Sequence, residues 1–261
     1  MQIEFSNIIL IALAIPCACS FGYLVFSLVA LERFHRQRKR TGTDRDFSPP
    51  VTLFKPVCGL DPEMLVNLRS FCRQDYPEYQ VIFGLQDQND PALEIIRQVI
   101  KEHPDVDIRY VVNPMRYGSN HKVSNLINMY PGAKHEYLLI ADSDMQVPND
   151  YLTKVMAPFA EASVGAVTCV YSGAARGGIT SHLNAMFINE WFLPSVLISE
   201  IIQKTRFCLG ATMVVRRGIL EQVGGFSALK DFLADDYMLG QLVSDAGYGS
   251  PSGTVFRTAS A

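Results

Sequence analysis

Hydrophobic side chains are most concentrated near the N-terminus, where the stretch from Ile8 to Leu31 carries no charge. A helix of that length would be about 36 Å long, enough to cross the hydrocarbon core of a bilayer. A cluster of arginine and lysine follows directly, whereas Glu4 is the only charged side chain before it. Basic residues favour the cytosolic side of a membrane. The pattern predicts a transmembrane anchor in residues 1–32, a basic and polar linker in 33–50, and a cytosolic location for everything beyond.

Two other structures share this apolar composition. A cleaved signal peptide would begin with a basic segment and contain a shorter apolar core. A helix buried in a soluble core would not need the arginine cluster that follows. The sequence therefore favours a single uncleaved anchor.

After Pro50 the chain alternates between apolar, strand-like runs and helix-like runs. The predicted strands cover residues 51–57, 79–85, 107–112, 137–141, 164–171 and 210–215, and the predicted helices cover 61–73, 91–101, 122–129, 149–160 and 237–246. This βαβα order predicts an α/β domain over residues 51–248, with a mostly parallel sheet and helices on both faces. Such sheets bind ligands beyond the carboxyl ends of their strands, which here follow Leu85 and Ile140.

Composition narrows the class of protein further. Hydrophobic residues make up 48% of the 261 residues and charged residues 19%, which fits a globular domain joined to one membrane segment. The formal net charge of −3 gives no electrostatic reason to bind nucleic acid. Six cysteines occur without a Cys-x-x-Cys pair, so we expect reduced thiols and neither disulfides nor a zinc site.

Carboxylates follow both of the strands that end at candidate ligand sites. Asp90 closes a polar run after Leu85, and Asp142 and Asp144 follow the apolar strand 137–141. Like charges held together repel each other unless a cation lies between them, and carboxylate oxygens suit Mg²⁺ or Mn²⁺ with substrate phosphates as further ligands. Asp-Ser-Asp alone is more often an exposed turn. Its position directly after an apolar strand favours a metal site.

Two more polar clusters precede predicted helices. Residues 118–122 offer backbone N–H groups, a helix N-terminus and the Lys122 ammonium, which together suit a phosphate group. Asp235 and Asp236 precede the helix that starts at Tyr237. One of the two is expected to cap that helix, which leaves the other as a candidate general base.

Residues 184–202 form another apolar stretch, interrupted by Pro194. A buried helix pair is one interpretation. The other is a segment at the membrane interface, where a lipid acceptor would enter. Glu190 and Glu200 argue against a second span. The glycines within residues 223–226 predict a tight turn near the acceptor side.

Eight motifs occur in a fixed order: Phe54-Lys55-Pro56, Gly59-Leu60-Asp61-Pro62, Asp75-Tyr76-Pro77, Asp90-Pro91-Ala92, the loop 118–122, Asp142-Ser143-Asp144, Gly224-Gly225 and Asp235-Asp236-Tyr237. With the anchor, they make residues 5–248 resemble the ceramide glucosyltransferases of glycosyltransferase family 21. The resemblance extends to bacterial members associated with hopanoid biosynthesis. The resemblance implies the nucleotide-sugar-binding fold called GT-A and a place in a bacterial inner membrane.

The resemblance also implies roles for individual residues. Asp90 is expected near the nucleotide base and ribose, and Lys122 and Asp142 at the donor nucleotide. Asp142 with Asp144 would hold Mg²⁺ or Mn²⁺, and Asp236 would be the catalytic base. The implied reaction is the inverting transfer of a hexose or N-acetylhexosamine from a UDP-sugar to a lipid hydroxyl of ceramide or a hopanoid polyol.

One departure from the family pattern lies at the C-terminus. The family continues to an Arg/Gln-x-x-Arg-Trp motif and several membrane spans, whereas residues 249–261 are mostly small and polar, and Trp191 is the only tryptophan. We therefore expect a truncated chain that binds nucleotide sugar weakly. Two alternatives stay open: a polysaccharide synthase or polyprenyl-phosphate glycosyltransferase of the same fold, and an inactive fragment.

Overall fold

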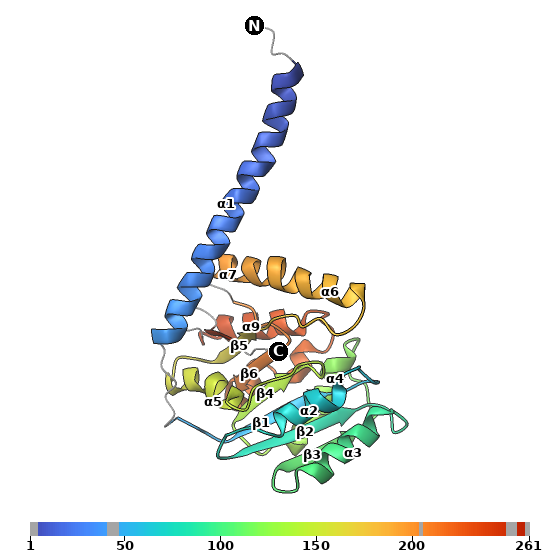
Figure 1. The fold of residues 1–261 in the computed structure, drawn as a ribbon. Helices are drawn as coiled ribbons and strands as arrows, with labels where there is room; N and C mark the ends of the chain where they lie inside the picture. Colours follow the sequence, from blue (N-terminus) through green and yellow to red (C-terminus); the bar gives the residue numbers. More distant parts are fainter. Residues whose placement is uncertain (1–4, 41–46, 204–205, 249–254, 259–261) are drawn as a thin grey trace. The chain divides into compact units, whose positions relative to one another are not determined.

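The computed structural model describes residues 5–40, 47–203, 206–248 and 255–258. The chain divides into two compact units (Figure 1). The first consists of Met1–Gly42 and Gly173–Lys204, and its described elements are helical. The second consists of Thr43–Ser172 and Thr205–Ala261 and contains the sheet.

Within the described residues, a 7-stranded sheet has the strand order β3-β2-β1-β4-β6-β5-β7. The strands β1 to β4 run parallel to one another, and β6 runs antiparallel to both β4 and β5. The predicted, mostly parallel sheet is therefore confirmed. The strand bounds are Val51–Pro56 (β1), Tyr79–Leu85 (β2), Asp107–Val112 (β3), Tyr137–Ala141 (β4), Ala166–Val170 (β5), Thr212–Arg216 (β6) and Val255–Thr258 (β7).

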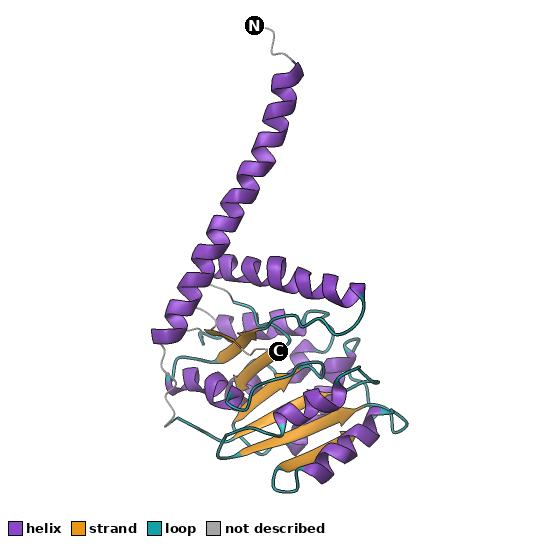
Figure 2. Cartoon of the chain, viewed as in Figure 1, coloured by secondary structure: helices purple, strands orange, loops and turns teal. Residues whose placement is uncertain are grey.

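Helices cover both faces of this sheet (Figure 2). Leu53 and Leu139 pack into one hydrophobic core, while their neighbours Phe54 and Ile140 pack into the other. The strands are apolar at consecutive positions because neither face is open to water. One core includes α2 (Met64–Phe71), α3 (Ala92–Glu102) and α5 (Tyr151–Met156), and the other includes α4 (His121–Met129), α8 (Arg217–Gln222) and α9 (Asp235–Asp245).

Several predicted boundaries were wrong. The helix predicted over 61–73 begins only at Met64, which leaves Asp61 in a loop. The helix predicted over 149–160 ends as the 3₁₀ turn η2 (Ala157–Ala160), because Pro158 has no N–H with which to continue α5. Residues 249–261 are predicted to be an atypical tail. Of these, the structure describes only β7, which pairs with β5 at the edge of the sheet.

Glycines form the predicted turn before the 3₁₀ turn η4 (Phe226–Leu229). Gly224 and Gly225 have φ angles of 98° and 66°. Residues that have a side chain rarely adopt such positive φ angles, so the turn requires glycine at both positions. The shorter 3₁₀ turn η1 (Tyr130–Gly132) follows α4.

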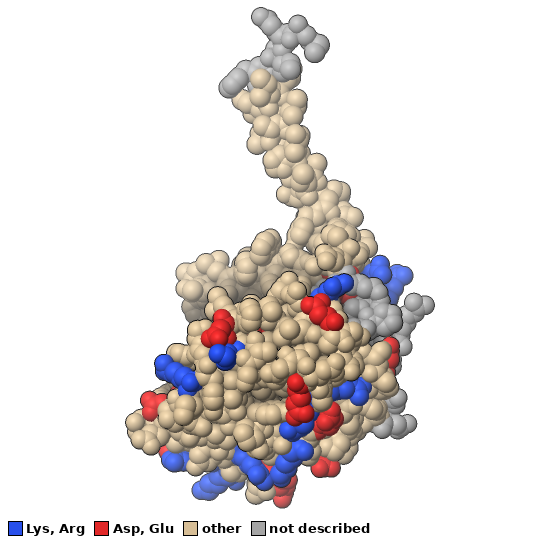
Figure 3. All heavy atoms as spheres, turned by 180° about the vertical axis from the view of Figure 1, so that it is seen from behind, with Lys and Arg blue, Asp and Glu red and all other residues tan. Residues whose placement is uncertain are grey.

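The first unit begins with α1 (Phe5–Arg40), so part of the predicted linker 33–50 is helical, and residues 41–46 lie outside the described residues. The N-terminal part of α1 projects away from the other helices of this unit and is called here its free length (Figure 1). On the face seen in Figure 3, this free length shows no charged side chain. By length and composition, two helical stretches could cross a membrane, Asn7–Arg36 and Ile179–Ile202.

The predicted break at Pro194 does not occur. The helix α6 (Ile179–Met186) continues through a π-helical segment, η3 (Phe187–Phe192), into α7 (Leu193–Ile202). Pro194 falls in the first turn of α7, and the wider π segment before it accommodates the missing N–H and the proline ring. The run from Ile179 to Ile202 is therefore one helix.

Candidate active site

The Asp-Ser-Asp motif lies in the turn that follows β4. Asp142 is the first residue after the strand, and Ser143 donates a hydrogen bond to Asp61 Oδ2 at 3.3 Å. The pKa of Asp144 is raised, first because its carboxyl is shielded from water and then because Asp142 and Asp61 are negatively charged. Three carboxylates therefore gather at this edge of the sheet, in a field that would favour a cation.

Lys122 provides a positive charge to this cluster. Its Nζ lies 2.6 Å from Asp142 Oδ1. Asn120 caps the helix α4 by accepting a bond from Val123 N at 3.0 Å, which fixes Lys122 in the first turn. Burial alone would lower the pKa of Lys122, but the neighbouring carboxylates raise it: Asp142, Asp235 and Asp236. Lys122 thus joins the turn after β4 to the start of α9.

Asp236 approaches Lys122 across a glycine. A Cβ atom built on Gly210 would lie 3.1 Å from Asp236 Oδ2 and 3.6 Å from Lys122 Nζ. The other carboxylate oxygen of Asp236 accepts a bond from Tyr237 N at 2.8 Å. The predicted base and the predicted donor-binding lysine therefore lie next to each other, with Gly210 leaving the space between them open.

The expectation that Asp235 or Asp236 caps α9 was wrong. Both residues lie inside the first turn, and Ala234 occupies the cap position without a side-chain bond. Asp235 is only 7% exposed and accepts a bond from Asn120 Nδ2 at 3.3 Å. Burial raises its pKa, although the charge of Lys122 opposes the shift. Asp235 therefore joins the N-termini of α4 and α9.

Tyr171, just after β5, interacts electrostatically with the carboxylates that are predicted to bind the metal and to act as the base. Its pKa is raised by partial burial and then by the negative charges of Asp142, Asp144 and Asp236. No sequence motif marks this tyrosine. It is the last residue of the strand predicted over 164–171, and that position at the end of a strand was the available signal.

Asp90 lies at the same edge of the sheet but has different contacts. Its Oδ2 accepts a bond from Gly59 N at 2.8 Å, and its Oδ1 accepts one from Ala92 N at 2.9 Å. Asp90 therefore ties the loop after β1 to the start of α3. Neither bond reaches Lys122 or Asp142, because β1 separates β2 from β4 in the sheet.

Lys55 is a second residue of this site for which its sequence motif, Phe54-Lys55-Pro56, predicts no role. It is fully buried in β1, with its Nζ 3.5 Å from the centre of the Phe71 ring, and it donates a hydrogen bond to the backbone carbonyl of Asp142. Burial lowers the pKa of Lys55 to about 7, against the opposing charges of Asp142 and Asp144. A lysine inside an otherwise apolar strand was the signal for it.

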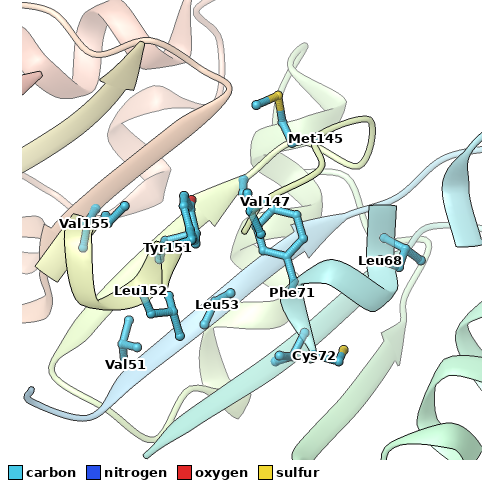
Figure 4. Packing of buried hydrophobic residues seen from close by; sticks show 14 of the residues in the cluster. Val51, Leu53, Leu68, Phe71, Cys72, Met145, Val147, Tyr151, Leu152 and Val155 are labelled. Atoms are coloured by element: carbon cyan, nitrogen blue, oxygen red, sulfur yellow. The ribbon is translucent and has the colours of Figure 1, made fainter. Parts of the chain in front are cut away.

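Hydrophobic side chains pack around the loop that directly follows the Asp-Ser-Asp motif. In Figure 4, Phe71 lies beside Val147, beneath the loop that carries Met145. All three belong to one buried cluster, and Phe71 meets Tyr151 edge-on with ring centres 5.6 Å apart. This packing fixes the Phe71 ring against the Lys55 ammonium and holds the loop after the Asp142 turn in place.

A complete protein-only metal site is absent from the described residues, where no three His, Cys, Asp or Glu side chains are grouped to hold an ion. Asp142 and Asp144 still fit the chemistry of Mg²⁺ or Mn²⁺, which commonly take one or two carboxylates and complete their shell with substrate phosphates and water.

Comparisons with known proteins give the family. The family model described as Glycosyl transferase family 21 matches residues 12–252. Ceramide glucosyltransferase 1 of Caenorhabditis elegans is 24% identical over 239 residues, which cover 91% of this chain and 51% of the relative. Ceramide glucosyltransferase of Komagataella phaffii is 32% identical over 141 residues, 51% of this chain and 28% of the relative. The chain spans about half the length of the first relative, and less of the second.

Solved structures agree on the fold. The mannosyltransferase PcManGT from Pyrobaculum calidifontis, in complex with GDP-Man and Mn²⁺, matches with a TM-score of 0.65 and 23% identity over 95% of this chain and 68% of that one. TarS 1-349 of S. aureus, in complex with UDP, matches with a TM-score of 0.50 and 15% identity over 80% of this chain and 60% of that one. The GT-A-like fold predicted from the sequence is confirmed. Because the family model matches most of its length, the chain belongs to glycosyl transferase family 21.

Proposed function

We propose that this protein is a membrane-bound, inverting glycosyltransferase that moves a hexose or N-acetylhexosamine from a UDP-sugar to a lipid hydroxyl. Its family supports glycosyl transfer, and the ceramide glucosyltransferase relatives support a lipid acceptor such as ceramide or a hopanoid polyol. The most direct structural support is Lys122, which bonds to Asp142 at 2.6 Å and faces Asp236 across Gly210. Groups suited to the donor and to the base thereby share one ionic cluster.

Asp142 and Asp144 would hold Mg²⁺ or Mn²⁺ together with the donor diphosphate. A bound ion would supply positive charge to neutralise the departing diphosphate. The raised pKa of Asp144 supports this role, because burial and then the like charge of Asp142 disfavour its carboxylate, and a bound cation would offset both effects. Lys122 is positioned to exchange Asp142 for a phosphate oxygen. The fold neighbour that contains GDP-Man and Mn²⁺ supports metal use in this fold.

Asp236 would act as the general base. The acceptor hydroxyl oxygen attacks the anomeric carbon from the side opposite the diphosphate, and its proton passes to the Asp236 carboxylate. The bond from the anomeric carbon to the diphosphate oxygen breaks as the new carbon–oxygen bond forms. A single displacement of this kind inverts the anomeric configuration. The Asp236 oxygen that faces Gly210 is the one proposed to receive the proton.

Asp90 is proposed to bind the base and ribose of the nucleotide. Its two carboxylate oxygens each accept one backbone bond, from Gly59 and Ala92. A carboxylate has about four acceptor positions, so a ribose hydroxyl can bond to it without breaking either contact.

Calorimetry on the full chain in detergent tests the donor and the metal together. UDP-glucose, UDP-N-acetylglucosamine and GDP-mannose would be titrated with Mn²⁺ present and again after chelation. We expect a UDP-sugar to bind only with the metal present. Tighter binding of GDP-mannose would replace the proposed donor, and failure of a folded chain to bind any of them would favour the inactive-fragment alternative.

Product analysis then tests the acceptor. With a radiolabelled UDP-sugar and mixed lipids, the proposal predicts a lipid that carries a single sugar. A polymeric product would favour a polysaccharide synthase instead, and a sugar attached to a polyprenyl phosphate would favour the other alternative.

A further inference from the structure

Exposed apolar side chains line one side of the helix from Ile179 to Ile202. Neighbours along this stripe are separated by one, three or four residues, so they share one face of the helix. No described element covers these side chains, which remain between half and four-fifths exposed: Ile179 (81%), Leu183 (59%), Met186 (59%), Phe187 (51%) and Trp191 (57%). A stripe of this kind on a helix indicates contact with something apolar.

The opposite side of the helix faces its own unit. Ala185 is 8% exposed, and a Cβ atom on Gly173 would come within 2.8 Å of its Cα. Asn189 exchanges two hydrogen bonds with the Gly173 backbone, at 2.8 and 2.9 Å. These contacts fix the rotation of the helix, so the apolar stripe points outward for a structural reason.

Contacts of the Tyr23 hydroxyl join this helix to α1 at a defined position along α1. The Tyr23 hydroxyl lies at hydrogen-bond distance from the Trp191 carbonyl, 3.3 Å, and from Ser195 Oγ, 3.1 Å. From Phe5 to Tyr23, α1 rises by about 27 Å, close to the roughly 30 Å thickness of a hydrocarbon core. In Figure 1 the α6–α7 run leaves the side of α1 just below this free length. Tyr23 and Trp191 thus meet at the depth where aromatic residues concentrate in membrane proteins.

Chain connectivity excludes a second membrane crossing by this helix. The chain leaves the sheet after β5 and returns at β6, and Thr168 of β5 pairs with Met213 of β6. A single crossing would place the two helix ends on opposite sides of the membrane. One of the two segments that connect the helix to the sheet would then have to cross back, and the described residues of both, 171–178 and 206–211, are non-helical. Their polar backbone groups would lack partners in lipid. Glu190 and Glu200 would add a further penalty.

We infer that α6–η3–α7 lies along the cytosolic surface of the bilayer, with Ile179, Leu183 and Trp191 inserted among the lipids beside the headgroups. The partner is the phospholipid bilayer itself. This inference rests on the helical unit and the strand pairing, so it stands or falls separately from the donor and acceptor proposed above.

Trp191 tests the inference without any substitution, because it is the only tryptophan in the chain. The full chain would be reconstituted in phosphatidylcholine–phosphatidylglycerol vesicles whose lipids carry a quenching label either near the headgroup or near the end of the acyl chain. We expect blue-shifted Trp191 emission that the shallow label quenches more strongly than the deep one. Emission quenched by aqueous iodide and by neither lipid label would overturn the inference.

Two variants in a Trp191→Phe background separate a surface helix from a spanning one. Leu183 lies about 12 Å from Trp191 along a helix axis. A Leu183→Trp reporter should nevertheless show the same shallow depth as Trp191. A Leu13→Trp reporter, in the free length of α1, should be quenched most by the deep label and calibrates the bilayer centre. A large difference in depth between the reporters at 183 and 191 would mean that the helix spans, and the inference would be wrong.

Discussion

Asp142 contacts both lysines of the candidate site, through its side chain to Lys122 and through its backbone to Lys55. The two contacts have different consequences. The bond to Lys122 must open for a metal ion or a phosphate to take its place, whereas the buried bond to Lys55 can persist. We therefore expect Asp142 to bind ligands with its carboxylate while its backbone position stays fixed.

Replacing Asp142 with asparagine tests this role in the metal site. The Asp142→Asn variant should weaken Mn²⁺ and UDP-sugar binding together, because one carboxylate serves both. Changes to groups that merely support a metal ligand commonly cost about 10–100-fold in metal affinity, and at least that loss is expected here. Calorimetry with each ligand measures it. Asp150→Asn is the matched control, since among the described residues the Asp150 carboxylate, 55% exposed, forms its ion pair with Lys154. Unchanged metal-dependent binding by Asp142→Asn would remove Asp142 from the site.

Asp236 and Asp235 are adjacent acids with separable effects. In a version of the protein that turns over, Asp236→Asn should lower kcat by about 10²–10⁴-fold, the usual contribution of a general base, and leave donor binding intact. Asp235→Asn should instead act on the joint between α4 and α9, where Asp235 bonds to Asn120. Steady-state kinetics and donor titration distinguish the two. Loss of donor binding in Asp236→Asn would indicate a structural role.

At the scale of elements, α9 packs closely against the backbone of Phe207 and Cys208. A Cβ atom on Gly240 would lie 2.6 Å from Cys208 N, the group that donates a bond to the Asp236 carbonyl. Alanine favours a helix by up to about 1 kcal/mol over glycine, but overpacking costs about 1–3 kcal/mol. We expect Gly240→Ala to lower the free energy of unfolding, measured in urea. Gly218→Ala is the control, because its nearest neighbour is 3.7 Å away. Equal stability of the two variants would contradict this packing.

The contact between α2 and α3 should depend on pH. Arg69 donates two hydrogen bonds to Glu102, at 2.6 and 2.5 Å, and lowers the pKa of that carboxyl from 4.5 to about 2. A lowered pKa stabilises the folded state above the unfolded value, so this contribution should be complete above about pH 4.5 and disappear as the pH falls through 2. Urea unfolding of wild type and Glu102→Gln should differ at neutral pH and converge in acid. A constant gap would show that the charge is not responsible.

The elements differ in how well the sequence predicted them. The strands β2, β3 and β4 were predicted with the correct bounds. In β2 and β4 the residues are buried on both faces, so their apolar runs leave a nearly unbroken signal. The continuity of the helix through Pro194 was missed, since a π segment depends on packing that a local pattern does not contain. In the candidate site, motifs predicted roles for Asp142, Asp144 and Asp236, and these roles stay predictions. Lys55 and Asp61 also belong to sequence motifs, but their contacts with the Asp142 turn could not be predicted, because they form only when separate segments of the chain meet. The position of Gly210 beside Asp236 and Lys122 depends on the fold in the same way.

At the scale of the whole molecule, the exposure of each cysteine indicates which thiols a reagent can reach. Cys58 is exposed in the sheet-containing unit, and Cys17 and Cys19 are exposed on α1. Cys72, Cys169 and Cys208 are buried, and burial raises the pKa of both Cys72 and Cys208 to about 12, which suppresses the reactive thiolate. In a membrane, lipid should protect the thiols of α1, so Cys58 should be the main site for a polar maleimide.

Labelling of sealed bacterial vesicles then tests the predicted orientation. Inside-out vesicles should react at Cys58, and right-side-out vesicles should not, because the basic end of α1 favours the cytosol. Cys58→Ser, expressed at the same level, should abolish the signal. Labelling of right-side-out vesicles alone would reverse the orientation.

Because β5 and β6 pair antiparallel, the segment between them, inferred above to lie on the membrane, can be exchanged as one unit. Residues 173–204 are inserted between two strands whose register is set by their own ladder, Ala166 to Val215, Val167 to Val214 and Thr168 to Met213. Nothing in that ladder depends on the sequence of the insert. This segment can therefore change in evolution to suit a new lipid environment, or be replaced with that of a relative, while the register of the strands around the candidate site is preserved.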